Sequence, residues 1–451
     1  MKKKFLKFTS FFIVTAFLSS CGTTSTESIY SDTLPVIKND ESIVTVTKAT
    51  VTETEISFVS ETTATEASET EATTVTSSET EITTTIPAPE FIEADTERFS
   101  EALSSVYSEY GITGMSVAVF SNGEIIYTES LGYADRENKI PCDDNTRYRI
   151  ASPSKLISTI ALMKLCEEGK LSLDTELSEA TEIDYDWAYN NEKVKLVHLL
   201  THTAGLFDSW SFEFEPNMKY GINRLMRISK NGYEPGTVFN YSNFGSGSIG
   251  AIIEQITGEY FHNYADRVLF TPLGMDAGYV IDHIDDKESC ANLYDYDGEI
   301  LKVREWGRDA RYYESFGLGN SYYTAQCELI ITASDLAGFG IALSGDGTFD
   351  GKRIMAEETV SKINNNYFSC DNFDMGLNVR IYDNFVDGRT IYGHPGNALG
   401  CITGIFYDPS DGTGIVILTN HCYPKTEENG IYSVLYEIVN EAYYCFFRYE
   451  E

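Results

Sequence analysis

Ser152 and Lys155 stand three residues apart in Arg149-Ile-Ala-Ser-Pro-Ser-Lys155, just before a run of apolar residues with helical spacing. Pro153 suits the first position of a helix, which makes Ser152 the expected N-cap. Residues three apart share a helix face, so the hydroxyl and the amine can meet. A partly buried lysine near the positive end of a helix should lose its proton more easily than a free lysine. A neutral amine beside a hydroxyl is a general base beside a nucleophile.

The same pair has a simpler interpretation. Ser152 could only cap the helix while the Lys155 side chain extends to water, and a Ser-x-x-Lys spacing is common by chance. Ser154 is a second hydroxyl nearby, but it is adjacent to Lys155 in the sequence and points elsewhere on a helix. The pair therefore needs support from other parts of the chain.

A second polar group, Tyr241-x-Asn243, follows a Pro-Gly turn. A tyrosine can relay a proton between a serine and a leaving group when a nearby cation favours its phenolate. An asparagine amide can donate to a substrate carbonyl and accept from an amine. The alternative is structural, with Asn243 capping the helix that runs to Thr257-Gly258.

A third group, His394-Pro395-Gly396-Asn397, lies on or beside a strand near the C-terminus. A glycine there would let a substrate approach the strand edge, and the backbone N–H of Asn397 would then point at the acyl oxygen. The alternative is that Pro395-Gly396 forms an ordinary type II turn.

The elements that must position these groups are strands at both ends of the region and helices between them. Apolar runs around an Asn-Gly turn predict a hairpin over 114–127. Further strands are expected at 390–392, 401–407 and 414–419, and terminal helices at 93–110 and 432–446. The predicted fold class is α+β, with one antiparallel sheet built from both ends of the domain, flanked by helices, and a helical insert.

The N-terminus has a different character. Residues 1–20 combine a lysine-rich start with an apolar run, which is typical of an export signal. The end of this segment, Leu18-Ser-Ser-Cys21, resembles a bacterial lipobox, in which the cysteine is lipidated. Lipid chains would supply membrane affinity directly. The alternative is plain secretion, with Cys21 as a spare thiol.

Residues 21–90 are rich in Thr, Ser and Glu, and from Val51 to Thr85 they contain no Lys, Arg, Gly or Pro. Such a composition cannot build a core, so this part is expected to be a disordered tether. Residues 91–451 have the composition of a globular domain. The three segments together predict an extracytoplasmic protein held at the membrane of a bacterial cell by the lipid on Cys21.

Charge and cysteine spacing exclude other functions. The formal net charge of −36 repels phosphate backbones, so nucleic acid is not an expected partner. No 18-residue apolar run follows residue 20, so no internal transmembrane helix is expected. Eight cysteines remain besides Cys21, without a Cys-x-x-Cys pair, and no zinc site or disulfide pairing is predicted. His198 and His202 are four apart, but no Glu stands between them and a packing role is expected.

Taken in order, Ser-x-x-Lys, Tyr-x-Asn and His-x-Gly resemble the motifs of the serine β-lactamase and penicillin-binding-protein superfamily, most closely its class C-like branch. The likeness covers roughly residues 98–445. Three further segments match recognisable stretches of these proteins: Val197–Leu206, Phe270–Met275 and Gly319–Leu329. The resemblance implies the β-lactamase/transpeptidase-like form of the α+β fold and no metal or organic cofactor.

The resemblance also implies catalytic roles for three residues. Ser152 is the acylated nucleophile and Lys155 takes its proton. Tyr241 moves protons to the leaving group in acylation and from water in deacylation.

The binding residues follow in the same way. Asn243 holds the substrate amide and touches Lys155, while the backbone N–H groups of Ser152 and Asn397 form an oxyanion hole. His394 and Gly396 line the strand side of the cleft.

One motif departs from the family pattern. Many β-lactamases have Lys-Thr-Gly where this chain has His394-Pro395-Gly396. A histidine is a weaker, pH-dependent cation, and a proline supplies no hydroxyl. The sequence therefore favours a peptidase or esterase that acts through a serine acyl-enzyme on D-amino-acid peptides, cell-wall-derived peptides or esters, with peptidoglycan as a possible partner. The alternatives are a β-lactamase proper and a non-catalytic wall-peptide-binding protein on the same fold, and the substrate, oligomeric state and deacylation rate stay open.

Overall fold

The computed structural model describes residues 93–185, 193–209, 221–302, 307–386, 388–423, 425 and 430–448. All of them belong to one unit of the chain, 84–451. The predicted signal at 1–20 and the whole predicted tether at 21–90, including Cys21, lie outside the described residues. None of the helices in the described segments has both the length and the apolar content needed to cross a bilayer.

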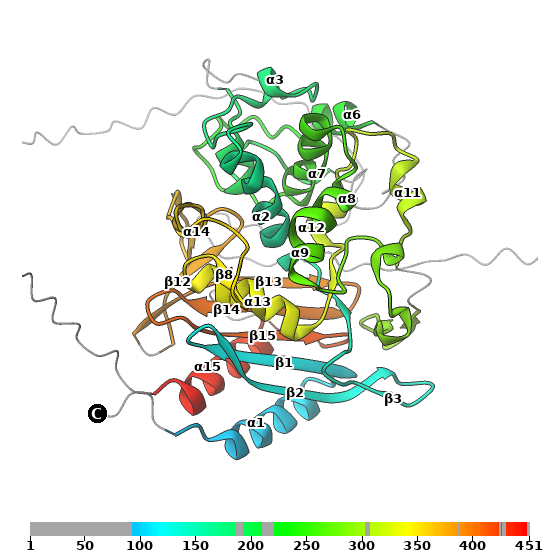
Figure 1. The fold of residues 1–451 in the computed structure, drawn as a ribbon, viewed down its shortest axis with the longest axis vertical. Helices are drawn as coiled ribbons and strands as arrows, with labels where there is room; N and C mark the ends of the chain where they lie inside the picture. Colours follow the sequence, from blue (N-terminus) through cyan, green and yellow to red (C-terminus); the bar gives the residue numbers. More distant parts are fainter. Residues whose placement is uncertain are drawn as a thin grey trace, which may run out of the picture. The chain divides into compact units, whose positions relative to one another are not determined.

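Nine strands of the described chain form one antiparallel sheet, in the order β10-β11-β12-β13-β14-β15-β1-β2-β3 (Figure 1). Their bounds are β1 Gly114–Ser121, β2 Glu124–Asp135, β3 Ile140–Pro141, β10 Phe368–Ser369, β11 Asp374–Met375, β12 Arg380–Val386, β13 Arg389–Ala398, β14 Cys401–Asp408 and β15 Thr413–Thr419. The pairing of β1 with β15 joins the two ends of the domain. The α+β arrangement predicted from the sequence is therefore present.

The predicted hairpin forms because Asn122 and Gly123 both adopt positive φ, 51° and 82°, which suits a two-residue turn between twisted strands. The strands meet in the register Ser121 opposite Glu124.

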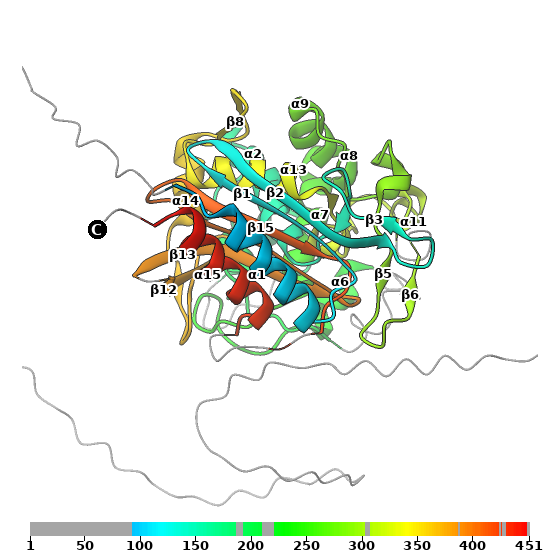
Figure 2. The same cartoon turned by 90° about the horizontal axis from the view of Figure 1, so that it is seen from below.

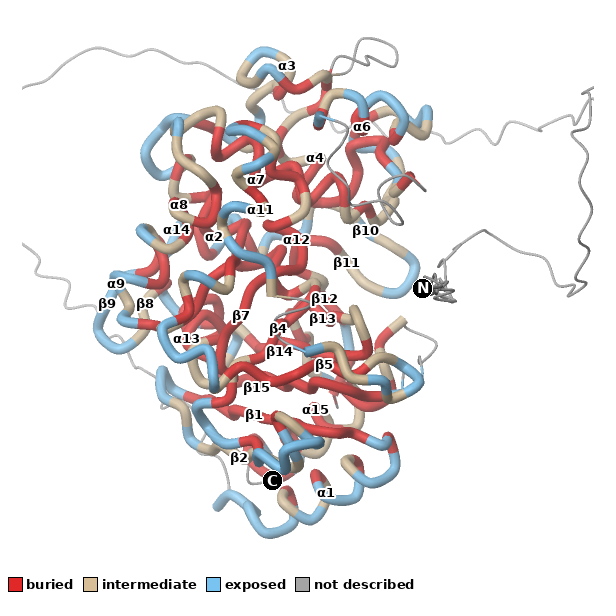
Figure 3. Tube along the Cα trace, turned by 90° about the vertical axis from the view of Figure 1, so that its right-hand side faces the viewer, coloured by how far each residue is buried: buried red, intermediate tan, exposed pale blue. Residues whose placement is uncertain are grey.

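Two helices cover one face of the sheet. They are α1 Thr96–Glu109 and α15 Ser433–Phe446, which lie side by side in Figure 2. The N–H of Asp95 donates to the carbonyl of Cys445 at 3.0 Å and so ties their ends together. The first helix starts three residues later than predicted because the Asp95 side chain accepts from the N–H of Arg98 and fixes the N-cap. Figure 3 shows the central strands β1, β14 and β15 as buried.

Helix α13, Ala333–Ser344, packs on the opposite face, and the helical insert lies beyond it (Figure 1). The other helices are α2 Pro153–Glu167, α3 Leu177–Ala180, α4 Leu196–Leu200, α6 Ile222–Ile228, α7 Asn243–Thr257, α8 Phe261–Ala265, η1 Asp266–Phe270, α9 Thr271–Leu273, η2 Ile281–His283, η3 Lys287–Ser289, α11 Ala310–Glu314, α12 Thr324–Cys327 and α14 Glu357–Asn364. Short strand pairs join β4 Tyr148–Arg149 with β7 Ile330–Ile331, β5 Leu293–Tyr294 with β6 Ile300–Leu301, and β8 Thr348–Phe349 with β9 Lys352–Arg353.

Helix α2 is the centre of the insert. Nearly all of its residues are buried, and it packs against α7, α12 and the strands β13 and β14. Its N-terminus therefore stands where the helical insert meets the sheet, which is the position that the candidate nucleophile occupies.

Candidate active site

Ser152 stands at a strained bend before α2. Ala151 has φ of 54°, a left-handed conformation that an alanine seldom adopts. The predicted capping role is wrong in one respect: Ser152 occupies the N-cap position, but its side chain makes no capping hydrogen bond. The hydroxyl lies instead within hydrogen-bond distance of the Lys155 and Tyr241 side chains. Its neighbour Ser154 is buried and accepts from the N–H of Leu329, so it is not a competing nucleophile.

Lys155 is fully buried and surrounded by acceptors. Its Nζ lies 3.1 Å from Ser152 Oγ, 2.8 Å from Asn243 Oδ1 and 3.0 Å from the carbonyl oxygen of Gln326. A neutral amine has two N–H groups and one lone pair. If the two oxygens of Asn243 and Gln326 take the N–H groups, the lone pair is left to face the serine hydroxyl. The alternative, in which the Lys155 side chain extends to water, is therefore wrong.

Tyr241 completes the surroundings of the hydroxyl. Its OH donates to Ser152 Oγ at 3.1 Å, and the Lys155 Nζ lies 5.2 Å from the centre of its ring. The oxygen of Ser152 is thus at the same distance, 3.1 Å, from two groups that can exchange protons with it. This arrangement can remove a proton from the serine and supply one to a leaving group.

Asn243 is the first residue of α7 and not its cap. Ser242 is the N-cap, because its Oγ accepts from the N–H of Gly245 at 2.9 Å. The structural alternative for Asn243 is therefore wrong. The amide is free to turn its Oδ1 toward Lys155 and its Nδ2 toward Asp208.

Asp208 was not identified from the sequence. Its two carboxylate oxygens accept from the backbone N–H groups of Asn243 and Phe244, from the amide of Asn243 and from the hydroxyl of Ser242, all at 2.9 Å. Four charge-assisted bonds hold the Tyr-x-Asn turn in place and fix the orientation of the Asn243 amide. An aspartate 35 residues upstream gives no local signal, so only the folded structure reveals it.

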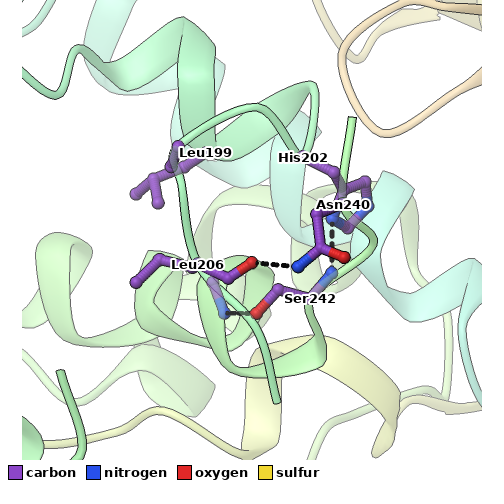
Figure 4. A pocket seen from close by; sticks show the side chains of 7 residues that line it. Leu199, His202, Leu206, Asn240 and Ser242 are labelled. Atoms are coloured by element: carbon purple, nitrogen blue, oxygen red, sulfur yellow. Dashed lines mark hydrogen bonds between the residues drawn. The ribbon is translucent and has the colours of Figure 1, made fainter. Parts of the chain in front are cut away.

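His202 supports Tyr241 from behind. The two rings stack with centres 4.3 Å apart. In addition, His202 Nδ1 accepts from the N–H of Ser242 at 3.2 Å, as Figure 4 shows. Burial, followed by the charges of Lys155 and Arg380, lowers the pKa of His202 well below its usual value. A cavity of about 10 Å³ next to it is about the size that one water needs. The predicted packing role of this histidine is consistent with these contacts.

Strand β13 brings the third motif against the nucleophile. A Cβ on Gly396 would lie 2.5 Å from Pro153 Cδ and 2.9 Å from the carbonyl oxygen of Ile150. Only glycine lets the strand come this close to the start of α2. The alternative of a type II turn at Pro395-Gly396 is wrong, because both residues lie inside β13 and pair with β14.

The register of this hairpin sets the direction of the Asn397 backbone. Leu399 and Gly400 have positive φ and form a two-residue turn, so Ala398 and Cys401 are the hydrogen-bonded closing pair. Asn397 and Ile402 are the next pair, and in an antiparallel ladder this pair shares no backbone hydrogen bonds. In agreement with this, the N–H of Ile402 donates to the side-chain hydroxyl of Thr419 instead. The N–H of Asn397 therefore faces the edge of β13 that lies toward α2.

Two N–H groups are thus available for a substrate carbonyl oxygen. The backbone N–H of Ser152 has no acceptor within the described parts of the chain. The side chain of Asn397 is held elsewhere, since it accepts from the Tyr296 hydroxyl and donates to Tyr432 at 2.9 Å. Only the backbone of Asn397 is left to act at the reacting centre.

His394 is not the cation that its place in the motif suggested. It is buried, its Nδ1 lies 2.8 Å from the carbonyl oxygen of Pro395, and its ring centre is 6.4 Å from that of Tyr241. Burial, followed by the charges of Arg380 and Lys155, holds the pKa of His394 well below its usual value. The side chain is neutral at physiological pH and packs behind the site instead of exposing a charge to it.

No group of three or more His, Cys, Asp or Glu side chains suited to a metal occurs in the described residues. His198 Nδ1 accepts from the N–H of Lys195, a structural contact. The eight cysteines within the described chain are free thiols, and Cys166 packs against the hydrophobic core.

Comparison with known proteins identifies the family and the fold. A model of the Beta-lactamase family matches residues 90–436. Protein flp of Staphylococcus aureus (strain N315) is 29% identical over 170 residues, which are 36% of this chain and 34% of flp. The chain therefore matches about a third of the length of this curated relative.

Solved structures of similar fold span most of the chain. EstCE1, a hydrolase with promiscuous acyltransferase activity, has a TM-score of 0.63 and 22% identity, covering 77% of this chain and 98% of EstCE1. A class C β-lactamase has a TM-score of 0.61 and 19% identity, covering 79% of this chain and 97% of its own. The predicted β-lactamase/transpeptidase-like fold and the resemblance read from the sequence are confirmed.

Proposed function

The chain belongs to the Beta-lactamase family, and on this premise we propose that it is a serine hydrolase that cleaves amide or ester bonds through an acyl-enzyme on Ser152. One observation carries the proposal: Ser152 Oγ lies 3.1 Å from both Lys155 Nζ and the Tyr241 hydroxyl. A serine that is only a helix cap would not need two proton-transfer groups around its oxygen.

In the proposed acylation, the proton of Ser152 passes to the lone pair of Lys155 and the serine oxygen attacks the substrate carbonyl carbon. The N–H groups of Ser152 and Asn397 stabilise the negative charge that develops on the carbonyl oxygen. Tyr241 gives its proton to the leaving group as the bond breaks, and Lys155 returns a proton to Tyr241. Deacylation runs through the same groups, with water in place of the leaving group.

The substrates proposed are D-amino-acid peptides, cell-wall-derived peptides or esters, at the outer side of a bacterial membrane. Two features support this choice. The third motif lacks the exposed lysine and hydroxyl that many β-lactamases have, and His394 is buried and neutral. The lipobox-like sequence at Cys21 and the Thr/Ser/Glu-rich tether support anchoring by lipid and an extracytoplasmic location.

A panel of substrates tests the proposal. The full-length protein is assayed with nitrocefin, p-nitrophenyl esters and peptides ending in D-Ala-D-Ala, in parallel with Ser152→Ala. Turnover of a peptide or ester that disappears in Ser152→Ala supports the proposal. Faster turnover of nitrocefin than of every peptide and ester would identify a β-lactamase instead, and turnover that survives Ser152→Ala would contradict the mechanism.

A further inference from the structure

A buried stretch of chain, the 325–330 segment, lies along the start of α2 and contacts the residues around the nucleophile. The carbonyl oxygen of Gln326 lies 3.0 Å from Lys155 Nζ. Three residues further along, the N–H of Leu329 donates to Ser154 Oγ at 3.2 Å. The position of this segment along α2 therefore decides where the acceptor for one N–H group of Lys155 stands.

The strand that leads to the nucleophile also contacts the 325–330 segment. Strand β4 pairs with β7 in the register Arg149 opposite Ile330. Next to this pair, the N–H of Ile150 donates to the carbonyl of Leu329 at 3.0 Å. Both strands have only two residues. Because so short a ladder contributes few hydrogen bonds, its alignment depends on side-chain contacts as well.

Arg149 and Glu328 make such a side-chain contact. Nη2 of Arg149 donates to Glu328 Oε1 at 2.6 Å and to Cys327 Sγ at 3.0 Å. The two charged side chains are buried, with exposed fractions of 2% and 6%. Arg149 precedes Ser152 by three positions in the sequence, and Glu328 follows two positions after Gln326. The ion pair thus joins the strand before the nucleophile to the segment that holds the base.

The Arg149–Glu328 ion pair is a poor source of stability. Burial of two charges costs free energy, and their attraction repays this cost only if the remaining donors are hydrogen-bonded too. Arg149 Nε and Nη1 are buried and have no hydrogen-bond partner among the residues that the structure describes. Apolar side chains of similar volume would stabilise the fold equally well or better. Stability is therefore a weak reason for an ion pair here, whereas the alignment of Gln326 with Lys155 is a specific one.

The alignment matters because the Gln326 carbonyl helps to set the rotation of the Lys155 amine. A neutral amine has two N–H groups and one lone pair. Asn243 Oδ1, at 2.8 Å, accepts one N–H group, and the Gln326 carbonyl accepts the other. The lone pair then faces Ser152 Oγ at 3.1 Å. If the carbonyl moved away, the amine would turn more freely and its lone pair would face the serine for only part of the time.

We propose that Arg149 and Glu328 are positioning residues, whose ion pair holds the Gln326 carbonyl against Lys155 and so keeps the amine aimed at Ser152. The inference rests on the proposed serine hydrolase function and adds two residues that contact neither the nucleophile nor the base. The planar guanidinium sets the direction of its hydrogen bonds as well as their length, which apolar contacts do not.

The full-length double variant Arg149→Met/Glu328→Met tests the inference, because it removes both charges together and nearly keeps the volume. Its midpoint of unfolding in urea should equal or exceed that of the wild type. The rate at which a fluorophosphonate labels Ser152 should nevertheless fall about 10- to 100-fold, the effect expected when a reacting group is misplaced. The kcat/KM for p-nitrophenyl acetate should fall by the same factor, since it also reports acylation.

Two further variants separate positioning from a general effect on the fold. Arg149→Lys keeps the charge but not the planar fork, so its labelling rate should lie between those of the wild type and the double variant. Arg147, two residues before Arg149, pairs at 2.8 Å with Asp276, which lies outside the 325–330 segment. Arg147→Met should therefore lower the urea midpoint and still label at the wild-type rate.

The possible results distinguish this inference from the hydrolase function on which it rests. If the double variant labels within about twofold of the wild-type rate, the positioning role is overturned while the hydrolase stands. If the double variant is less stable than the wild type, Arg149→Lys decides: slower labelling at an unchanged urea midpoint supports the role, and unchanged labelling overturns it. If the folded wild type is neither labelled nor active on the ester, the hydrolase itself is contradicted, and the positioning role with it.

Discussion

The candidate active site has two walls, a helical wall at the starts of α2 and α7 and a strand wall along β13 and the start of β12. The two walls differ in whether the hydrogen-bonding groups that line them already have partners within the protein. On the helical wall, the amine of Lys155 faces three oxygens and the carboxylate of Asp208 accepts four hydrogen bonds. On the strand wall, Arg380 has no counterion in the described residues, and the N–H of Asn397 faces an edge without a partner. The helical wall is complete without a ligand, whereas the strand wall is not.

This difference assigns separate tasks to the two walls. Groups that move protons must be held at fixed distances, so their hydrogen bonds are made by the protein itself. Groups that recognise a substrate must keep free donors, because only those can pair with a ligand. Changes on the helical wall should therefore affect every substrate, and changes on the strand wall should affect substrates selectively.

The largest effect is expected from Lys155→Met. Without the amine, Ser152 loses the group that takes its proton, and acylation should slow about 10²- to 10⁴-fold, the usual contribution of a positioned base. The rate at which a fluorophosphonate labels Ser152 measures the reactivity of the serine. Lys164→Met on the same helix removes an amine that pairs with Glu167, away from Ser152, and should label at the wild-type rate. A loss of less than tenfold in Lys155→Met would show that the lysine is not the base.

A smaller loss is expected from Asp208→Asn. An amide cannot accept all four hydrogen bonds, so the Tyr-x-Asn turn should loosen. Unfolding in urea should report a loss of about 1.5–3 kcal/mol, the range for hydrogen bonds to a charged group. Labelling should slow about equally for neutral and charged probes. A stability change without any change in labelling would mean that Asp208 only supports the fold.

Gly396→Ala tests the contact between the two walls. The new Cβ would clash with Pro153 and the Ile150 carbonyl. The backbone shift that removes this clash should lower the free energy of unfolding by about 1–3 kcal/mol. If the strand moves away from the nucleophile, labelling should slow about tenfold. Gly221→Ala is the matched control, because its nearest neighbour, Asn320 Oδ1, would be 3.5 Å away. Unchanged labelling in Gly396→Ala would show that the walls can separate without loss of chemistry.

The smallest effect on chemistry is expected at Glu254, at the far end of α7. It is buried and accepts from the N–H groups of Phe261 and Gly319, and burial raises its pKa from 4.5 to about 7. The folded protein thus holds this proton more tightly than the unfolded chain. The stabilisation is complete below pH 4.5 and is lost as the pH rises through about 7.

Urea unfolding between pH 4 and 8 checks this sign. The free energy of unfolding of the wild type, measured relative to Glu254→Gln, should fall with rising pH across that window. Labelling of Ser152 should be the same in both proteins at a given pH. A difference that rises with pH would reverse the assigned direction of the pKa shift.

The sequence was sufficient to predict those elements of the fold that are determined by residues a few positions apart. The turn at Asn122-Gly123, the start of α2 after Ser152 and the strands around 401–407 and 414–419 all follow from spacing and turn residues within a few positions. The three motifs were found because each contains its own polar residues at short spacing.

The remainder depends on contacts between distant segments. Asp208 has no local pattern, since its contacts are with the turn around Tyr241 and Asn243, 35 residues further along the chain. The burial of His394 depends on how β13 packs, so its loss of charge could not be seen in the sequence. In the sequence, Pro395 resembled part of a turn. In the structure it lies in β13 opposite Gly404, at a pair that shares no backbone hydrogen bonds, so a proline without an N–H is tolerated there.

The central claim is that Ser152 is the acylated residue, and mass spectrometry tests it most directly. The full-length protein is treated with a fluorophosphonate, digested and sequenced by fragmentation. The account predicts one adduct, on Ser152, and no adduct in Ser152→Ala. An adduct on another residue that persists in Ser152→Ala, or no adduct on the folded wild type, would contradict it.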